Sequence, residues 1–290
     1  METNLWIIGI VGGSTAILLL YWLFVLTEGT YLGQPVVTFL YDITASKYDS
    51  IKGFDIEMEA TYLGRPIADA LCQIPSPLLL DIATGTGRLP LTLFEQPTFQ
   101  GRIIGVDHSF SMIRLAARKL QPYGSHRLAL LWLDAMELPF PDKVFDAVTA
   151  LEMIEFTPNP SHLLAEAVRV LRPGGLFVVT RRRGLDARLM PAKTFTEQQM
   201  VDLVSALGIE HLSVTIWQVD YDLVCGVRAG SAALGPRTFL EVLYCPKCHQ
   251  LGLNQAASRL RCRNCGAEYW TEEGVINMNG EARCRRRRET

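Results

Sequence analysis

The sequence predicts an α/β protein: a doubly wound parallel sheet that closes with an antiparallel hairpin, preceded by a membrane-spanning helix and followed by a small cysteine-containing unit. Three observations predict this. Short apolar runs alternate with helical patterns through the middle of the chain, residues 5–26 carry no charge, and two C-x2-C pairs lie near the C-terminus. We therefore expect an anchor (1–27), a main domain (28–235), a four-cysteine unit (240–280) and a basic tail (281–290).

The composition excludes disordered and fibrous classes of protein. Hydrophobic residues make up 49% of the chain and charged residues 20%, so the chain can bury a core. Its 28 basic and 30 acidic side chains leave a net charge of -2. This balance argues against nucleic acid as a partner of the whole chain, without excluding a local basic contact.

The N-terminal stretch Leu5–Leu26 contains 22 residues without a charge. At about 1.5 Å per residue, a helix of this length spans the roughly 30 Å core of a bilayer. The stretch lacks the basic leader and cleavage site of a signal peptide, and a buried soluble helix would rarely run so far without a polar face. We therefore expect a single-pass membrane protein. Because Lys47 and Lys52 follow the stretch and no basic residue precedes it, the main domain is expected in the cytoplasm.

The main domain shows five short buried runs separated by helical or loop sequence, as in a parallel sheet covered by helices. Two extended runs meeting at Asp220 then predict an antiparallel hairpin. Helices are expected over 109–120 and 196–207. The predicted strands are Leu78–Ala83, Arg102–Asp107, Leu128–Leu133, Val144–Leu151 and Leu176–Arg181, and the hairpin strands are His211–Val219 and Tyr221–Arg228.

A glycine-rich turn, Thr84–Gly87, follows the first predicted strand. Glycine lets backbone amides approach a ligand closely at such a turn, and a helix begins there. The third glycine of the dinucleotide fingerprint is missing, since Leu89 and Pro90 follow, which disfavours a nicotinamide. Asp107 ends the second strand 20 residues after Gly87, where a carboxylate can accept the ribose hydroxyls of an adenosine.

Five segments in order resemble the class I S-adenosylmethionine-dependent methyltransferases, and specifically the small-molecule branch that includes quinone C-methyltransferases. The resemblance covers roughly residues 40 to 230 and implies a Rossmann-like fold with S-adenosylmethionine as the cofactor. The matching segments are Tyr41–Asp49, Leu80–Arg88, Gly105–Ser109 with Met112, Asp134–Val148, and Leu171–Gly175.

The resemblance also implies the residues that bind the cofactor: Tyr48, Asp81, Ala83, Gly85, Gly87, Asp107, His108, Met112, Asp134 and Ala135. Taken singly, several have structural alternatives. Asp81 could cap the loop amides, Asp134 could be a helix N-cap, Met112 could be a core residue, and Tyr41 and Tyr48 could line one apolar helix face.

Glu152, just past the fourth predicted strand, stands where this family turns side chains towards the substrate. We assign it as the catalytic base, with Glu155, His108 and Asp42 as competitors. The Asn/Asp-Pro-Pro-Tyr/Phe signature of amide and base N-methylation is absent, because the stretch reads Leu151–Ile154 as Leu-Glu-Met-Ile. This absence disfavours, without excluding, a nitrogen acceptor of that kind. The expected anchor suggests a lipophilic acceptor such as a quinone precursor, a phenol or a lipid.

Cys245, Cys248, Cys262 and Cys265 form two C-x2-C pairs separated by thirteen residues. This spacing lets four thiolates surround one tetrahedral Zn(II), and we expect a zinc ribbon rather than two disulfides. The remaining cysteines, Cys72, Cys225 and Cys284, are expected to be free thiols. The ribbon resembles the small zinc-binding domains that activate some RNA and protein methyltransferases, so both a structural clip and a docking module stay open.

Two arginine clusters remain outside these motifs. Arg181–Arg183 lie at the end of the fifth predicted strand, where open parallel sheets place their ligand crevice, and Arg285–Arg288 could contact anionic lipid from the tail.

The main hypothesis is a membrane-anchored methyltransferase of a small lipophilic molecule. The alternatives are an RNA or protein methyltransferase that docks through the ribbon, and a membrane scaffold that keeps the fold without catalysis. The sequence does not indicate the oligomeric state.

Overall fold

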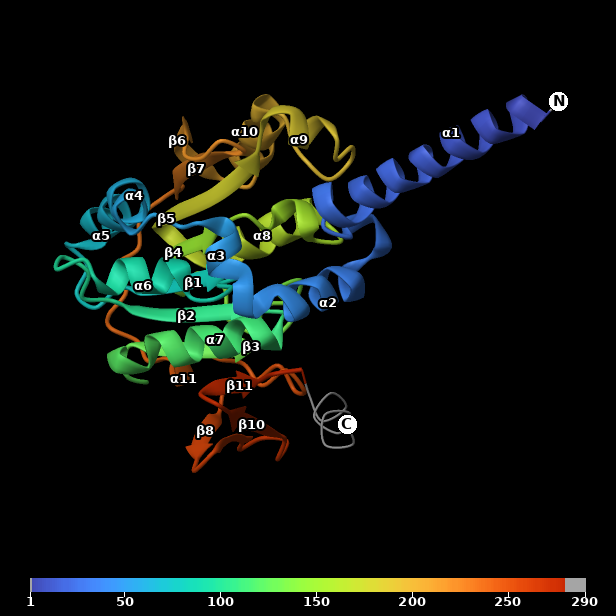
Figure 1. Cartoon of the computed structure of the whole chain (residues 1–290). Helices are drawn as coiled ribbons and strands as arrows, with labels where there is room; N and C mark the ends of the chain where they lie inside the picture. Colours follow the sequence, from blue (N-terminus) through green and yellow to red (C-terminus); the bar gives the residue numbers. More distant parts are fainter. Residues whose placement is uncertain (1, 280–290) are drawn as a thin grey trace.

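The computed structural model describes residues 2–279, and for residues 2–9 only the backbone. Helix α1 (Glu2–Tyr21) projects from the body of the molecule, and the chain then enters a layered α/β domain (Figure 1). The four-cysteine unit follows at the opposite end of the sheet from the terminal hairpin.

The five predicted parallel strands are confirmed. They are β1 (Leu78–Ile82), β2 (Arg102–Asp107), β3 (Leu128–Trp132), β4 (Phe145–Ala150) and β5 (Leu171–Arg182), in the order β5-β4-β1-β2-β3. The predicted hairpin is also confirmed, since β6 (Ile209–Ile216) and β7 (Tyr221–Arg228) pair antiparallel and β7 joins β5. Strand β5 begins earlier than expected because Leu171 pairs with Phe145 before a register shift.

Successive side chains of a strand point to opposite faces of the sheet, and both faces are buried. In β1, Leu79 packs into one buried cluster, whereas Leu78 and Leu80 pack into the other. The first face is covered by α5 (Arg65–Leu71), α6 (Arg88–Phe94) and α7 (Phe110–Leu120), with η5 (Gln121–Tyr123) after them. The second face is covered by α8 (Pro160–Val170) and α10 (Glu197–Ala206).

Short helices between the anchor stretch and β1 lie beside the carboxyl edge of the sheet (Figure 1). Helix α2 packs against α7, and the Asp42 carboxylate accepts hydrogen bonds from the Ser109 hydroxyl at 2.6 Å and the Ser111 amide at 3.1 Å. These contacts hold the segment over the strand ends. Its elements are η2 (Thr30–Leu32), α2 (Gln34–Thr44), η3 (Ala45–Lys47), α3 (Tyr48–Lys52), α4 (Ile56–Glu59) and the π-helical turn η4 (Ala60–Gly64).

The predicted transmembrane helix is not confirmed. Over the described residues, none of the helices combines the length and the apolar character needed to cross a bilayer. The uncharged stretch is instead divided between α1 and a π-helical turn, η1 (Trp22–Leu26). This turn rests on the domain, because the Trp22 indole donates to the Leu189 carbonyl at 2.8 Å and stacks on Tyr31 at 4.9 Å between ring centroids.

The four-cysteine unit continues the main sheet. Its strands are β8 (Leu253–Ala256), β9 (Arg259–Cys262), β10 (Glu268–Glu272) and β11 (Val275–Asn277), and β11 pairs in parallel with β3 to complete eleven strands. Leu260 and Ile276 belong to the same buried cluster as the core of the main domain. The predicted unit at 240–280 therefore shares a sheet and a core with the main domain. The predicted tail 281–290, with Cys284, lies outside the described residues.

Three short elements complete the chain: η6 (Ile154–Phe156), α9 (Gly184–Arg188) and α11 (Phe239–Val242).

Candidate active site

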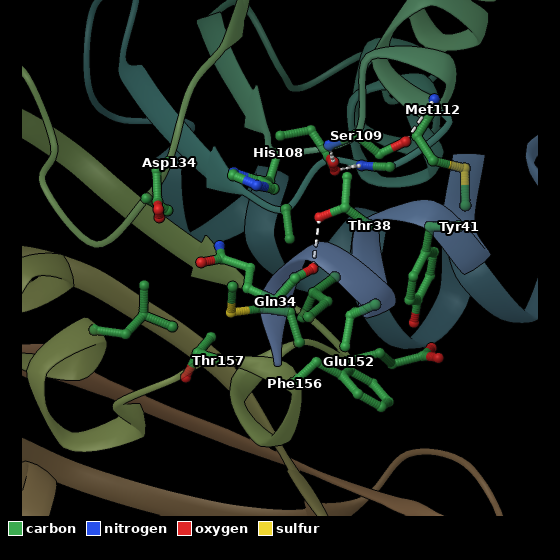
Figure 2. Close-up of a pocket in the computed structure, with 18 of the residues that line it drawn as sticks. Gln34, Thr38, Tyr41, His108, Ser109, Met112, Asp134, Glu152, Phe156 and Thr157 are labelled. Carbon is green, nitrogen blue, oxygen red and sulfur yellow. Dashed lines mark hydrogen bonds between the residues drawn. The ribbon is translucent and has the colours of Figure 1, made fainter. Parts of the chain in front are cut away.

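A cavity of about 130 Å³ opens at the carboxyl ends of β1 to β4, beneath α2 and α3 (Figure 2). Open parallel sheets place ligands at this edge, where the loops of neighbouring strands meet. Eight of the ten predicted cofactor residues line the cavity: Tyr48, Ala83, Gly85, Asp107, His108, Met112, Asp134 and Ala135. Their contact with a cofactor stays a prediction, but the fold brings them together as expected.

Asp107 organises the glycine turn. Its two carboxylate oxygens accept hydrogen bonds from the backbone amides of Gly85 and Ser109, each at 2.8 Å. Burial raises the pKa of Asp107 to about 6; the nearby charge of Asp42 acts in the same direction, and the hydrogen bonds from the backbone amides only partly oppose the two effects. The carboxylate therefore links the loops after β1 and β2 and lines the cavity between them.

Two predicted residues, Asp81 and Gly87, do not line the cavity. Asp81 is buried at the end of β1, where it accepts a hydrogen bond from the Thr149 hydroxyl at 2.7 Å, and burial raises its pKa to about 6. Gly87 has a φ of +82°, and a Cβ there would meet Leu120 Cδ1 at 2.7 Å. Glycine is thus required for the packing of α6 against α7, which is a structural role.

The loops after β2 and β3 shape the far end of the cavity. The Asp134 side chain accepts a hydrogen bond from the Met136 amide at 3.0 Å, and this closes a short turn. The carbonyl of His108 accepts a hydrogen bond from the Trp132 indole at 2.9 Å. Met112, 1% exposed, lies in the core while its side chain lines the cavity, so both of its predicted roles are compatible.

Aromatic side chains form the opposite end of the cavity. Tyr41 lies 5.9 Å from Tyr48 and 6.1 Å from Phe156 between ring centroids, and Val37 and Thr38 continue the lining along α2. Figure 2 shows Tyr41 and Phe156 away from Asp134. The spacing of Tyr41 and Tyr48 is visible in the sequence, whereas Val37, Thr38 and Phe156 were not predicted, because no local pattern indicates which side chains of a covering helix face a strand end.

Glu152, the predicted base, lines the cavity but is held by two cations. Its carboxylate lies 2.9 Å from Lys52 Nζ and 2.6 Å from Arg88 Nη1. Burial raises the pKa of Glu152, but the charges of Lys52 and Arg88 outweigh that effect, and the net pKa lies below its usual value. Such a carboxylate is a weak proton acceptor, so its environment argues for an electrostatic anchor instead of a base.

The backbone at Glu152 is also unusual, with a φ of +50°. Its amide donates to the Thr180 hydroxyl at 2.6 Å, which supports this left-handed conformation. Ala83, at the equivalent end of β1, has a φ of +56°. Strained residues of this kind cluster where a backbone must present a side chain or an amide to a ligand.

The competing bases are also engaged. Glu155 is 2% exposed and accepts a hydrogen bond from the Tyr221 hydroxyl at 2.5 Å, with Arg182 at 3.5 Å. It does not line the cavity, and burial is the main cause of its raised pKa. Asp42 accepts hydrogen bonds from Ser109 and Ser111, as described above. Of the predicted candidates only Glu152 and His108 line the cavity.

The arginines at the end of β5 do not line this cavity either. Arg181 pairs with Asp222, and Arg182 lies within 3.4 Å of Asp186. These guanidinium groups therefore form ion pairs near the end of β5 and do not face an anionic substrate in the cavity.

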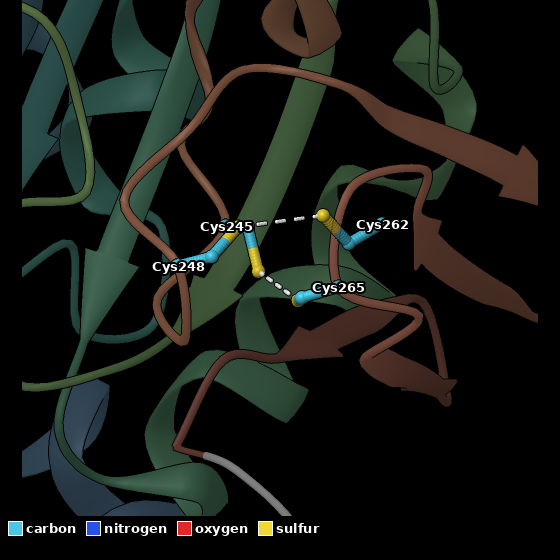
Figure 3. A group of neighbouring side chains, drawn as sticks. All are labelled: Cys245, Cys248, Cys262 and Cys265. Atoms are coloured by element: carbon cyan, nitrogen blue, oxygen red, sulfur yellow. Dashed lines mark hydrogen bonds between the residues drawn. The ribbon is translucent and has the colours of Figure 1, made fainter.

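The four predicted zinc ligands converge in the ribbon (Figure 3). Their sulfur atoms all lie within 4.8 Å of one another. The Sγ atoms of Cys245 and Cys265 are 3.6 Å apart, and those of Cys248 and Cys262 are 3.7 Å apart. Both separations are longer than the roughly 2.05 Å of a disulfide bond.

Comparison with known families places residues 80–179 in the family described as "Methyltransferase domain". The chain is 36% identical over 101 residues to a demethylmenaquinone methyltransferase of Bacillus cereus, covering 35% of this chain and 43% of the relative. It is 39% identical over 105 residues to the enzyme of the same name from Symbiobacterium thermophilum, covering 36% and 42%. The chain thus spans less than half the length of these relatives.

Solved structures share the fold at low sequence identity. The cyclase SpnF has a TM-score of 0.56 at 20% identity, covering 67% of this chain and 96% of its own. A Haloferax volcanii complex of the Trm112 methyltransferase activator with a putative methyltransferase has a TM-score of 0.50 at 20% identity, covering 66% and 98%. A SAM-dependent methyltransferase of Aquifex aeolicus has a TM-score of 0.50 at 18% identity, covering 65% of this chain and 98% of its own. Residues 80–179 therefore match the model of a methyltransferase domain, and the chain has a Rossmann-like fold.

Proposed function

We propose that the protein transfers a methyl group from S-adenosylmethionine to a small lipophilic acceptor of the phenol or hydroquinone class. The observation that carries this proposal is the single cavity that joins the loops after four parallel strands to a set of aromatic side chains. The family of residues 80–179 and the names of the relatives support the reaction and the acceptor class.

The loops fit the cofactor. Asp107 offers carboxylate oxygens for ribose hydroxyls, and Gly85 lets the backbone approach closely, with a φ of +56° and no atom within 4 Å of where a Cβ would stand. Asp134 and Met112 line the same cavity as Asp107 and border the space for the adenine ring of the cofactor. S-adenosylmethionine, when bound, supplies an electrophilic methyl group; the protein contributes position, orientation and exclusion of water.

The aromatic end fits a flat apolar acceptor. The rings of Tyr41, Tyr48 and Phe156 can pack against an aromatic ring at ordinary offset or edge-on separations. The signature of amide and base N-methylation is absent after β4, where Glu152 instead anchors Lys52 of α3 over the cavity. Oxygen or carbon of a phenolic ring is therefore the proposed methyl acceptor.

The test uses purified protein and two measurements. Calorimetric titration with S-adenosylhomocysteine is expected to show one binding site per chain. Labelled methyl transfer is then measured with a reduced 1,4-naphthoquinone that carries one isoprenoid unit. An absence of binding would contradict the cofactor, and binding without transfer to this hydroquinone or to simple phenols would favour the scaffold alternative.

The cysteine cluster fits Zn(II). A tetrahedral shell with Zn–S bonds of about 2.3 Å requires sulfur separations of about 3.8 Å. The two close pairs, at 3.6 and 3.7 Å, approach that geometry, and each pair joins the turn before β8 to the end of β9 or the loop that follows it. We expect one zinc ion per chain by metal analysis of the purified protein, bound by Cys245, Cys248, Cys262 and Cys265.

The ribbon supports the cofactor site from within the chain. Asn279 Nδ2 and the Met278 amide both donate to the Trp132 carbonyl, at 2.9 and 3.0 Å, and the Trp132 indole in turn holds the His108 carbonyl. The Tyr244 amide donates to the Pro139 carbonyl at 2.8 Å, so the loop after β3 is held as well. Since β11 already pairs with β3, this role is favoured over docking of an RNA or protein substrate, and the Trm112 complex is an example of a methyltransferase with an activator.

A membrane surface is the proposed site of action. The described part of α1 exposes Ile17, Leu18 and Leu20, each more than half exposed, and a lipophilic acceptor partitions into lipid. Flotation with phosphatidylcholine vesicles tests this: wild-type protein is expected to float, and a triple Ser variant of these positions is expected to remain in the dense fraction.

A further inference from the structure

A tyrosine that lines the cavity is hydrogen-bonded to a carboxylate that no motif in the sequence indicates. Tyr41 of α2 lines the aromatic end, and its hydroxyl donates to Glu28 Oε2 at 2.7 Å. Glu28 stands in the turn between η1 and η2, where it is half-buried and has a φ of +47°. This backbone conformation, uncommon for glutamate, aims the carboxylate at the tyrosine.

The other carboxylates near the aromatic end of the cavity have different partners. Glu152 pairs with Lys52 and Arg88, and Glu155 is held by Tyr221 and Arg182. Asp49 accepts from Thr86 Oγ1 and Lys119 Nζ. Glu28, by contrast, accepts its hydrogen bond from the neutral hydroxyl of Tyr41, which itself lines the cavity. Within residues 2–279, no cationic side chain lies within salt-bridge distance of the Glu28 carboxylate.

We propose that Tyr41 is a catalytic residue that passes a proton from the acceptor hydroxyl to Glu28. This rests on the proposed function, and it narrows the acceptor to a molecule with an ionisable hydroxyl. The acceptor O–H proton moves to Tyr41 Oη while the Tyr41 proton moves to Glu28 Oε2. The acceptor ring donates an electron pair to the methyl carbon as the bond between that carbon and sulfur breaks, and sulfur keeps the bonding pair.

The electrostatic surroundings suit a relay rather than a free phenolate. Burial, followed by the charge of Glu28, raises the pKa of Tyr41 well above its ordinary value, so Tyr41 remains protonated between turnovers. The proton thus needs a second site, and the carboxylate of Glu28 provides it. The titratable groups that act on this pair come from several elements: Tyr48 of α3, Glu155 of η6, Arg182 of β5 and Tyr221 of β7.

The relay predicts a specific pattern for Glu28→Gln, measured with the prenylated naphthohydroquinone and saturating cofactor. Because general base catalysis contributes about 10²- to 10⁴-fold, kcat is expected to fall about 100-fold or more. Tyr41→Phe should show a similar loss, and Glu28→Asp should recover part of it.

Controls separate this chemistry from a structural defect. Glu28 is not among the residues that line the cavity, and it accepts its hydrogen bond from Tyr41 at the aromatic end, so S-adenosylhomocysteine affinity is expected to stay within about twofold of the wild type. Glu57→Gln, an exposed acid of α4, is the matched variant and should retain the wild-type kcat.

The possible results are distinct. If wild-type protein transfers no methyl group to the hydroquinone, the proposed function fails and the relay fails with it. If the wild type transfers normally and Glu28→Gln keeps the wild-type kcat, only the relay is overturned. A loss of kcat that comes with an equal loss of cofactor affinity also overturns the relay, because a structural role then explains the effect.

Discussion

The carboxylate of Asp107 gives the sharpest test of the cofactor site, through the substitution Asp107→Asn. Asparagine keeps the size of the side chain but replaces one acceptor oxygen with a donor. In the structure both oxygens accept backbone amides, from Gly85 and Ser109 at 2.8 Å each. The amide side chain can satisfy only one of them, and it also loses the charge that strengthens a bond to a ribose hydroxyl.

The magnitude follows from the bonds lost. A hydrogen bond to a charged group contributes about 1.5–3 kcal/mol, and every 1.4 kcal/mol is a factor of about ten in affinity. Losing the charged partner of one ribose hydroxyl therefore weakens S-adenosylhomocysteine binding by about 10- to 150-fold. Some of the loss comes from loosening of the two loops, so a thermal melt of the unliganded protein accompanies the titration.

Calorimetric titration at pH 7.5 measures the effect, with Asp142→Asn as the matched control. Asp142 pairs with Arg169 on the surface, its side chain is 66% exposed, and it lies outside the cavity lining. Its substitution is expected to leave affinity within about twofold, as is usual for a distant exposed site. Binding by Asp107→Asn within twofold of the wild type, in a protein that melts normally, would refute the assignment of this carboxylate to the cofactor.

Four further predictions follow from the same contacts. The pKa of Asp107 near 6 implies that S-adenosylhomocysteine affinity is retained above pH 6 and falls by up to about tenfold per unit below it; titrations across this range should show the fall in the wild type and not in Asp107→Asn. Arg88→Met leaves the carboxylates of Glu59 and Glu152 buried without their shared cation, so the free energy of unfolding, measured in urea, is expected to drop by about 3–5 kcal/mol. Trp132→Phe removes one hydrogen bond to the His108 loop and should weaken S-adenosylhomocysteine binding by about five- to tenfold with little change in the melting temperature. Removal of zinc by a chelator should unfold the ribbon and weaken the same binding, and readdition of zinc should restore it; unchanged affinity in a metal-free protein would contradict the supporting role of the ribbon.

Local patterns predicted the sheet and its loops well. The strands carry buried apolar runs bounded by turns, and the glycine turn and Asp107 occur where a strand ends, so both are visible without tertiary information. The structure confirms the five parallel strands and the hairpin, and it brings eight predicted residues to one cavity. These features depend on neighbours that are close in sequence or related by the regular geometry of a parallel sheet.

The errors and omissions concern contacts between distant segments. The uncharged N-terminal stretch has the length of a membrane span, but its last turn packs on the loop after α9 through Trp22, which hydropathy cannot reveal. Glu152 has the position of a base, yet Lys52 and Arg88 reach it from α3 and α6. Glu28 and Tyr41 are thirteen residues apart and meet across a turn of no recognised motif. In each case the environment of the side chain depends on a contact with another segment, and no local pattern in the sequence reveals that contact.

The pairing of the ribbon with β3 shows why the two units need each other. Without β11, β3 would be the edge of the sheet, with unpaired amides and carbonyls beside the loops that carry His108 and Asp134. The ribbon in turn has too few apolar residues to fold alone without metal, and Ile276 and Leu260 share the core of the domain. Covering the edge therefore stabilises both units and fixes the strand ends that form the cavity. By its contacts, the four-cysteine unit is thus part of the same sheet and core as the strands whose ends line the cavity.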